Sequence, residues 1–233
     1  MEYNKAIHDI AIQKLETTMD ELLWKLDGKK FENETDIKKA YIEEAFNLLV
    51  QNFVYDNKST NAVKKLKTLE EKKKLYSQLI SLEKCVLENT GVCRQFSEYL
   101  LLLTANERVT QEFGSEIYSS KIQCKIHCPS GDTDAHAINR FVFDEKDLFC
   151  DLSMGVHNRD NGKNTNDFLL KPKQEYKNNL LAADGSVLDK KTISIHFAPD
   201  TIGNLYDFLI NFDESIKNGT IDHNRFDYEQ LEM

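Results

Sequence analysis

Residues 122–152 read IQCKIHCPSGDTDAHAINRFVFDEKDLFCDL, and this stretch decides the fold class. Apolar and polar side chains alternate over 122–128, which is the two-residue period of a half-buried strand. The next four residues, PSGD, have the composition of a turn. Two further strands are predicted over 135–143 and 148–152, separated by a short polar loop, so the segment should form an antiparallel hairpin.

The residues before this stretch have a different period. Apolar side chains recur every three or four positions from Tyr3 to Asp27, which is typical of an amphipathic helix, and Trp24 is expected in its buried stripe. A second helix should begin with Thr35 as its N-cap, and residues 60–88 are again rich in helical pattern. Helices followed by strands indicate an α+β fold.

The residues after the hairpin are less regular. Residues 157–167 are rich in Asn, Asp and Gly and are predicted to form an exposed loop. A further strand is expected over 192–197. A final helix is expected to start at Asp200 and run through Phe212.

Charge and hydropathy exclude two classes of partner. The 30 Lys and Arg residues against 39 Asp and Glu give a net charge of −9, the wrong sign for a protein that binds phosphates with cations, so nucleic acid is not expected. No apolar stretch approaches the roughly 20 residues of a membrane helix, and the N-terminus has no apolar signal region. We therefore predict a cytoplasmic protein, or one exported as an effector without a cleaved signal peptide.

Five cysteines are present, and an odd number in a chain without a signal favours reduced thiols. Cys124, His127 and Cys128 raise the alternative of a zinc site. However, positions 124 and 127 point to opposite faces of a strand, and the sequence offers no evident fourth ligand. We expect Cys124, Cys128 and Cys150 to be inward-facing strand residues, and we predict no metal.

Three polar residues fall where this layout can bring them together. Cys93 is at the start of a predicted helix, His136 is on the second strand and Asp151 is on the third. A helix N-terminus and a nearby imidazolium both favour the thiolate form of a cysteine, and Gly91 should permit the turn that places the thiol there. An imidazole can move the proton, and a carboxylate can hold the ring in the required tautomer.

The hairpin register tests whether Asp151 can be that carboxylate. If Asp144 and Glu145 form a two-residue loop, paired positions sum to 289, so His136 faces Ser153 and Asp151 is its diagonal neighbour on the same face. A four-residue loop would stretch the link, and an odd slip would separate the two side chains. The rival residues for orienting the imidazole are Asp134 and Asn139.

The same residues carry a resemblance to a known family. The segments TGVCRQFS (90–97), DAHAIN (134–139) and FCDLS (149–153) resemble the core of the transglutaminase-like superfamily, which includes transglutaminases, cysteine peptidases and peptide N-glycanases. Ile138 stands where that family commonly has an aromatic residue, and FVYD (53–56) is similar to a segment that often precedes the cysteine helix.

The resemblance implies a papain-like transglutaminase core, with a helical N-terminal half and the nucleophile at the N-terminus of a helix packed on an antiparallel sheet. It implies one domain over 1–233, with 1–58 as a helical extension and 59–233 containing the catalytic core. No organic cofactor is implied, and the partner would be a peptide or protein substrate. The oligomeric state is left open.

The resemblance also implies the chemistry. Cys93 would attack an amide carbonyl and form a thioester, His136 would carry the proton, and Asp151 would orient His136. The backbone N–H of Cys93 and a side chain such as Gln51 or Asn52 would bind the oxyanion. Water as acceptor would give a peptidase or deamidase, and an amine would give a transglutaminase. The alternative is a transglutaminase-like domain that has lost activity and binds a protein.

Overall fold

A computed structural model describes residues 5–66, 68, 71, 82–127, 133–183 and 194–199 of the chain. Within these residues the fold is α+β, as the change of period predicted. The helices are α1 (Lys5–Leu26), α2 (Glu34–Asn52), α3 (Asn57–Lys64), α5 (Leu82–Glu88), α6 (Cys93–Thr104), α7 (Glu107–Phe113), α8 (Leu152–Asp160) and α9 (Lys173–Ala183), with a 3₁₀ helix η1 at Thr165–Phe168. The strands are β1 (Val54–Tyr55), β2 (Thr90–Gly91), β3 (Ser119–His127), β4 (Thr133–Phe143), β5 (Lys146–Cys150), β6 (Lys171–Pro172) and β7 (Ser194–Pro199).

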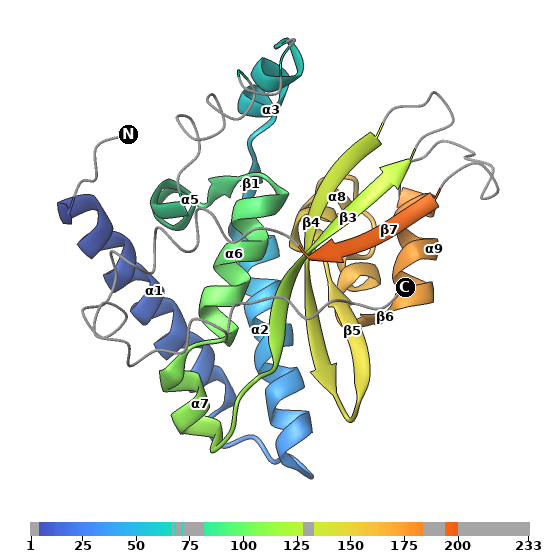
Figure 1. Cartoon of the computed structure of the whole chain (residues 1–233). Coiled ribbons are helices and arrows are strands. Elements are labelled where there is room, and N and C mark those ends of the chain that lie inside the picture. Colours follow the sequence, from blue (N-terminus) through green and yellow to red (C-terminus); the bar gives the residue numbers. More distant parts are fainter. Residues whose placement is uncertain are drawn as a thin grey trace.

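The helices of the first half form one side of the molecule. Helices α1 and α6 contact each other and both contact α2 and α5, and Figure 1 shows the four helices grouped beside the sheet. Helix α6 is also in contact with β3 and β4, so it joins the helical group to the sheet. The buried apolar side chains form one cluster that includes residues of α1, α2, α6 and the sheet. This cluster contains residues from both sides of position 58. The division of the chain into 1–58 and 59–233 stays a prediction.

Helix α1 has the predicted amphipathic pattern, except at Trp24. Its buried stripe is spaced by three or four residues, as expected for a helix that packs on one face. Trp24 was expected in the core, but it is 77% exposed. It follows the buried Leu22 by two positions, about 200° around the helix, so the indole points away from the core. The buried stripe consists of Ala11, Leu15, Met19, Leu22 and Leu26.

The start of α2 also differs from the prediction. The N-cap is Asn33 and not Thr35. The Oδ1 atom of Asn33 accepts a hydrogen bond from the backbone N–H of Asp36 at 2.9 Å, which satisfies one of the free donors of the first turn. Both residue types are good N-caps, so composition did not distinguish the two positions.

The larger sheet has the strand order β6-β5-β4-β3-β7, and its neighbouring strands pair antiparallel. The register of β4 and β5 confirms the two-residue loop, because Phe143 lies opposite Lys146 and Asn139 lies opposite Cys150. Asp144 and Glu145 have φ of 50° and 60°, the left-handed values that a tight hairpin turn of this kind requires. The strand expected near 192–197 is present as β7, as far as the described residues reach.

The region after β5 is more helical than the sequence indicated. Residues 157–167 were expected to form a loop, but α8 continues to Asp160 and η1 begins at Thr165. Packing explains the difference. A methyl group added at Gly155 would lie 2.6 Å from Cζ of Phe46 and 2.8 Å from Cγ2 of Val50, so α8 lies directly against α2 at this glycine. Helix α9 was not predicted, and it contacts β5 and β6.

Some expectations lie outside the described residues. These are the helix proposed from Asp200 to Phe212 and the position of Cys128. None of the described helices is long and apolar enough to span a membrane.

Candidate active site

Cys93 is the first residue of α6, at the end of β2. The preceding residue, Val92, is the N-cap and has no side chain that can accept a hydrogen bond, so the first turn is not capped in the usual way. The Oε1 atom of Gln95 instead accepts from the backbone N–H of Val92 at 3.4 Å. The thiol is therefore at a helix N-terminus that carries no competing capping side chain.

The approach to Cys93 is fixed by packing and not by a glycine turn. Gly91 was expected to permit a turn, but it is a strand residue, and its φ is not positive. A methyl group at Gly91 would lie 3.1 Å from Sγ of Cys85 and 3.2 Å from Cβ of Gln95, so this position requires a small residue. In this segment the backbone is left-handed at Asn89, two residues before Gly91, where φ is 52°. Its Oδ1 atom accepts a hydrogen bond from Nζ of Lys14 on α1 at 2.9 Å.

The segment FVYD (53–56) lies beside this approach. Strand β1 pairs in parallel with β2, so that Val54 is opposite Thr90 and Tyr55 is opposite Gly91. The N–H of Asp56 donates to the carbonyl of Gly91 at 2.8 Å. The ring of Phe53 is 4.7 Å from that of Phe96 on α6. The end of α2 is thus connected to the start of the cysteine helix.

His136 and Asp151 contact each other directly. The Nε2 atom of His136 is 2.6 Å from Oδ2 of Asp151. The strand ladder did not produce this contact in the way predicted. Pairing of β4 with β5 ends at Asn139 and Cys150, and Asp151 is the N-cap of α8 and not a strand residue. Ser153 is consequently not paired with His136, although its Oγ atom lies 3.5 Å from Nε2.

The Cys93 thiol lies close enough to the imidazole of His136 to act on it through charge and a hydrogen bond. Burial by itself would lower the pKa of His136, but the charges and hydrogen bonds of Asp151 and Cys93 outweigh it and raise the pKa well above its usual value. The imidazole is 14% exposed and Asp151 is fully buried. The three side chains thus form one connected group in which the imidazole favours its protonated form.

Asp151 is held by four donors, two on each oxygen. Oδ1 accepts from the backbone N–H of Met154 at 3.0 Å and from Oγ of Ser153 at 3.2 Å. Oδ2 accepts from His136 and from the hydroxyl of Tyr176 at 2.9 Å. A buried carboxylate needs such donors to remain ionised.

Ser153 and Tyr176 are residues of this site that sequence reasoning did not assign. The register arithmetic placed Ser153 near His136, so a signal existed for it. Tyr176 follows Asp151 by 25 positions in a helix that was not predicted, and no motif marks it.

The rival orienting residues have other positions. Asn139 donates from Nδ2 to the carbonyl of Ser97 at 2.9 Å, and it lies three positions from His136, on the other face of β4. Asp134 is in β4 opposite Ile126, and its side chain is not among the described ones.

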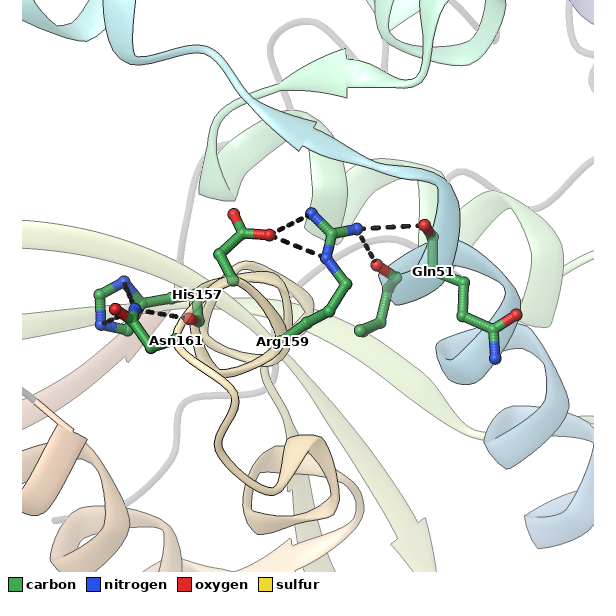
Figure 2. Close-up of polar contacts among 6 residues, drawn as sticks. Gln51, His157, Arg159 and Asn161 are labelled. Atoms are coloured by element: carbon green, nitrogen blue, oxygen red, sulfur yellow. Dashed lines mark hydrogen bonds and ion pairs between the residues drawn. The ribbon is translucent and has the colours of Figure 1, made fainter.

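Gln51 and Asn52 are at the C-terminal end of α2, and both are exposed. The Asn52 amide donates to the carbonyl of Leu48 at 2.8 Å. Among the described contacts, neither side chain is joined to Cys93 or His136. Figure 2 shows Arg159 of α8 donating to the last carbonyls of α2, including that of Gln51 at 3.2 Å, while the Gln51 amide extends away from it. Arg159 therefore ties the helix capped by Asp151 to the helix that carries both residues.

The other described cysteines are buried and free. Cys85, Cys124 and Cys150 are each fully buried, which confirms that Cys124 and Cys150 face inward. Burial raises the pKa of Cys124 to about 12. The side chain of His127 and the whole of Cys128 lie outside the described residues, and no group of three metal-binding side chains occurs within them.

Comparison with known proteins adds little to this geometry. No protein-family model and no curated protein matches the chain. Among solved structures, the chain is similar to a crystal structure of a TGase, with 19% identity and a TM-score of 0.37 over 64% of this chain and 31% of that one. The chain spans about a third of the length of that protein. We draw no functional argument from a similarity this low. The proposed function is argued from Cys93, His136 and Asp151 instead.

Proposed function

We propose that this chain is a cysteine-dependent enzyme of the transglutaminase-like, papain-like type, acting on amide bonds of peptides or protein side chains. One observation carries the proposal. A single imidazole lies 2.6 Å from the buried carboxylate of Asp151 and also interacts, through charge and a hydrogen bond, with the Cys93 thiol. This is the arrangement that activates a thiol and orients its base.

The chemistry takes two steps through a thioester. The Cys93 thiolate attacks the carbonyl carbon of the amide, and the carbonyl oxygen takes up the negative charge. As the C–N bond breaks, the His136 imidazolium gives its proton to the departing nitrogen, so a neutral amine leaves and an acyl-enzyme remains. Water or a second amine then attacks the thioester carbon and gives a proton to His136, and the Cys93 thiolate departs.

The oxyanion requires donors near Cys93. The backbone N–H of Cys93 is the first of them, because it belongs to the first turn of α6, where helical N–H groups have no acceptor within the helix. Gln51 and Asn52 remain candidates for the second donor. One hydrogen of the Asn52 amide is used by Leu48, which leaves the other for a substrate.

The remaining proposals follow from this function. The substrate would be a peptide or a protein, and the whole of residues 1–233 would act as one domain with the helical segment before residue 59. A cytoplasmic enzyme and an effector exported without a cleaved signal peptide are both consistent with a chain of this type.

Mass spectrometry of a peptide mixture incubated with the protein, with and without a primary amine, tests the proposal. Cleavage, deamidation of side-chain amides, or amine adducts would each identify the acceptor. Cys93→Ala and His136→Ala should abolish every such product. Cys85→Ala removes a buried thiol away from the imidazole and should leave the products unchanged.

The opposite result identifies the other class of protein. If the chain forms no product with any amide, and a partner protein binds equally well to wild type, Cys93→Ala and His136→Ala, the chain is a binding domain that has lost activity. A product that persists in Cys93→Ala would also contradict the proposal.

A further inference from the structure

The buried carboxylate of the site receives a donor from a part of the chain that the proposed mechanism does not use. Tyr176 is on α9, and its side chain is fully buried. Its hydroxyl lies 2.9 Å from Oδ2 of Asp151, which is the same oxygen that accepts from Nε2 of His136. The phenol and the imidazole therefore compete for the charge of one oxygen atom.

Placement of Asp151 does not depend on this hydroxyl. The other oxygen, Oδ1, is fixed by the N–H of Met154 at the start of α8 and by Ser153. The backbone N–H of Asp151 donates to the carbonyl of Phe168 at 2.9 Å. With the carboxylate already held in this way, the phenol acts mainly on its charge.

The phenol is suited to remain a donor. Burial and the neighbouring Asp151 charge raise the pKa of Tyr176 well above its usual value, so the hydroxyl keeps its proton. Its ring packs against Phe149 and Phe168, with ring centroids 6.1 Å away in each case. These contacts would survive loss of the oxygen, because a phenylalanine retains the ring.

We propose that Tyr176 is a positioning residue for the proton of His136. By donating to Oδ2, its hydroxyl disperses the charge of Asp151 and weakens the hold of that carboxylate on the imidazolium, so that His136 can release its proton to the departing amine. This inference rests on the proposed function, because it assigns Tyr176 a part in the same proton transfer.

Several ionisable groups face this network and contribute to its titration. They come from each element packed around the imidazole, and any measured midpoint belongs to the coupled group. They are Cys93 on α6, Cys124 on β3, His136 on β4, Cys150 at the end of β5, Asp151 as the N-cap of α8, and Tyr176 and Lys177 on α9.

The test compares two alkylating reagents as a function of pH. Iodoacetate is an anion and is attracted by an imidazolium beside the thiolate, whereas iodoacetamide is neutral, so the ratio of their rates at Cys93 falls when His136 loses its proton. The rates are measured on the peptide that contains Cys93 by mass spectrometry. In Tyr176→Phe we expect the midpoint of this fall to move up by about half a pH unit, because the carboxylate then holds the imidazolium more strongly.

Two further variants separate this effect from damage to the site. Asp151→Asn removes the charge and should move the midpoint down by about one pH unit or more, opposite to Tyr176→Phe. Tyr41→Phe is the matched control, because Tyr41 is also fully buried and, among the residues that the structure describes, its hydroxyl donates to the carbonyl of Leu103 at 3.0 Å and to no group of the site. It should not move the midpoint.

A replacement of Tyr176 by 3-fluorotyrosine covers the case in which Tyr176→Phe does not fold. The fluorinated phenol is a stronger donor, so the midpoint should move down. An unchanged midpoint in either Tyr176 variant, or a downward shift in Tyr176→Phe, would overturn the inference while leaving the proposed function intact. A rate ratio without any fall in the wild type would instead refute the ion pair, and the proposed function with it.

Discussion

Two helices of this protein begin at residues of the candidate site, and their N-termini differ in how they are capped. Helix α8 begins after Asp151, whose carboxylate accepts from the N–H of Met154, so the helix and the carboxylate hold each other. Helix α6 begins after Val92, which provides no capping side chain, and its first residue is the thiol Cys93. At the start of α8 a backbone N–H donates to the capping side chain. At the start of α6 no described side chain caps the backbone N–H groups.

The difference matches the role that the proposed function gives to each side chain. A group that orients an imidazole has to stay in one place, and four donors with a cap achieve that for Asp151. A nucleophile has to meet a substrate, and donors near it are needed for the oxyanion. A helix without a capping side chain is less stable by about 1 kcal/mol than one with a good N-cap. In the proposed function, the free N–H groups of α6 would bind the oxyanion instead.

Among changes at the two helix starts, the largest expected effect comes from removing the charge of Asp151 while keeping its cap. Asp151→Asn should lower the rate of product formation by about 10³-fold or more, because the amide nitrogen faces Nε2 of His136 and selects the wrong tautomer. Its oxygen can still accept from Met154, so the free energy of unfolding should fall less than in Asp151→Ala, which loses the cap as well, worth about 1 kcal/mol. Steady-state rates and urea unfolding measure the two effects. Equal loss of stability in both variants would contradict the capping role.

The second prediction concerns the contact that places α8. Gly155→Ala should destabilise the protein by about 1–3 kcal/mol, because the added methyl group has no room against Phe46 and Val50. Denaturant unfolding measures this. His157→Ala, two residues later at an exposed position of the same helix, serves as the control. A stability of Gly155→Ala equal to that of wild type would show that α8 can move away from α2 at no cost.

The third prediction uses the pH dependence of stability. The pKa of His136 is raised in the folded state, so its contribution to stability is fully present below its unfolded value of about 6.5 and is lost as pH rises through the higher folded value. The loss cannot exceed about 1.4 kcal/mol per pH unit for one proton. The double variant His136→Gln, Asp151→Asn lacks the pair and should lose less stability between neutral and alkaline pH. Parallel stability curves for the two proteins would refute this.

The smallest expected effect comes from giving α6 the cap that it lacks. Val92→Thr keeps the shape of the side chain and adds a hydroxyl that can accept from the N–H of Gln95. We expect the free energy of unfolding to stay within about 1 kcal/mol of wild type, and alkylation of Cys93 to slow by about threefold, because the first turn then offers less positive charge to the thiolate. Val142→Thr, a half-buried position on β4, is the control for the hydroxyl itself. Faster alkylation in Val92→Thr would contradict the comparison.

Much of this arrangement could be predicted, and the errors have physical causes. The alternation over 122–128 predicted the first strand, and the two-residue loop at Asp144 and Glu145 predicted the register of β4 with β5, because both signals are local. Gly91 was expected to permit a turn, but its small size is needed because Cys85 of α5 packs against it. A contact between two elements of this kind has no local sequence signal. Trp24 was assigned to the core on composition, although its place about 200° around α1 from Leu22 turns the indole away from the buried stripe.

The sequence by itself determined the three reactive residue types, their order along the chain and the elements near which they lie. The tertiary structure decided that Asp151 ends a strand by capping a helix, that Gly155 allows this helix to pack against α2, and that Tyr176 completes the carboxylate's donors. The reason is the range of the forces involved. Periodicity and turn preferences act over a few residues, whereas a buried charge must be satisfied by whichever donors packing brings to it, here from a helix 25 positions further along the chain.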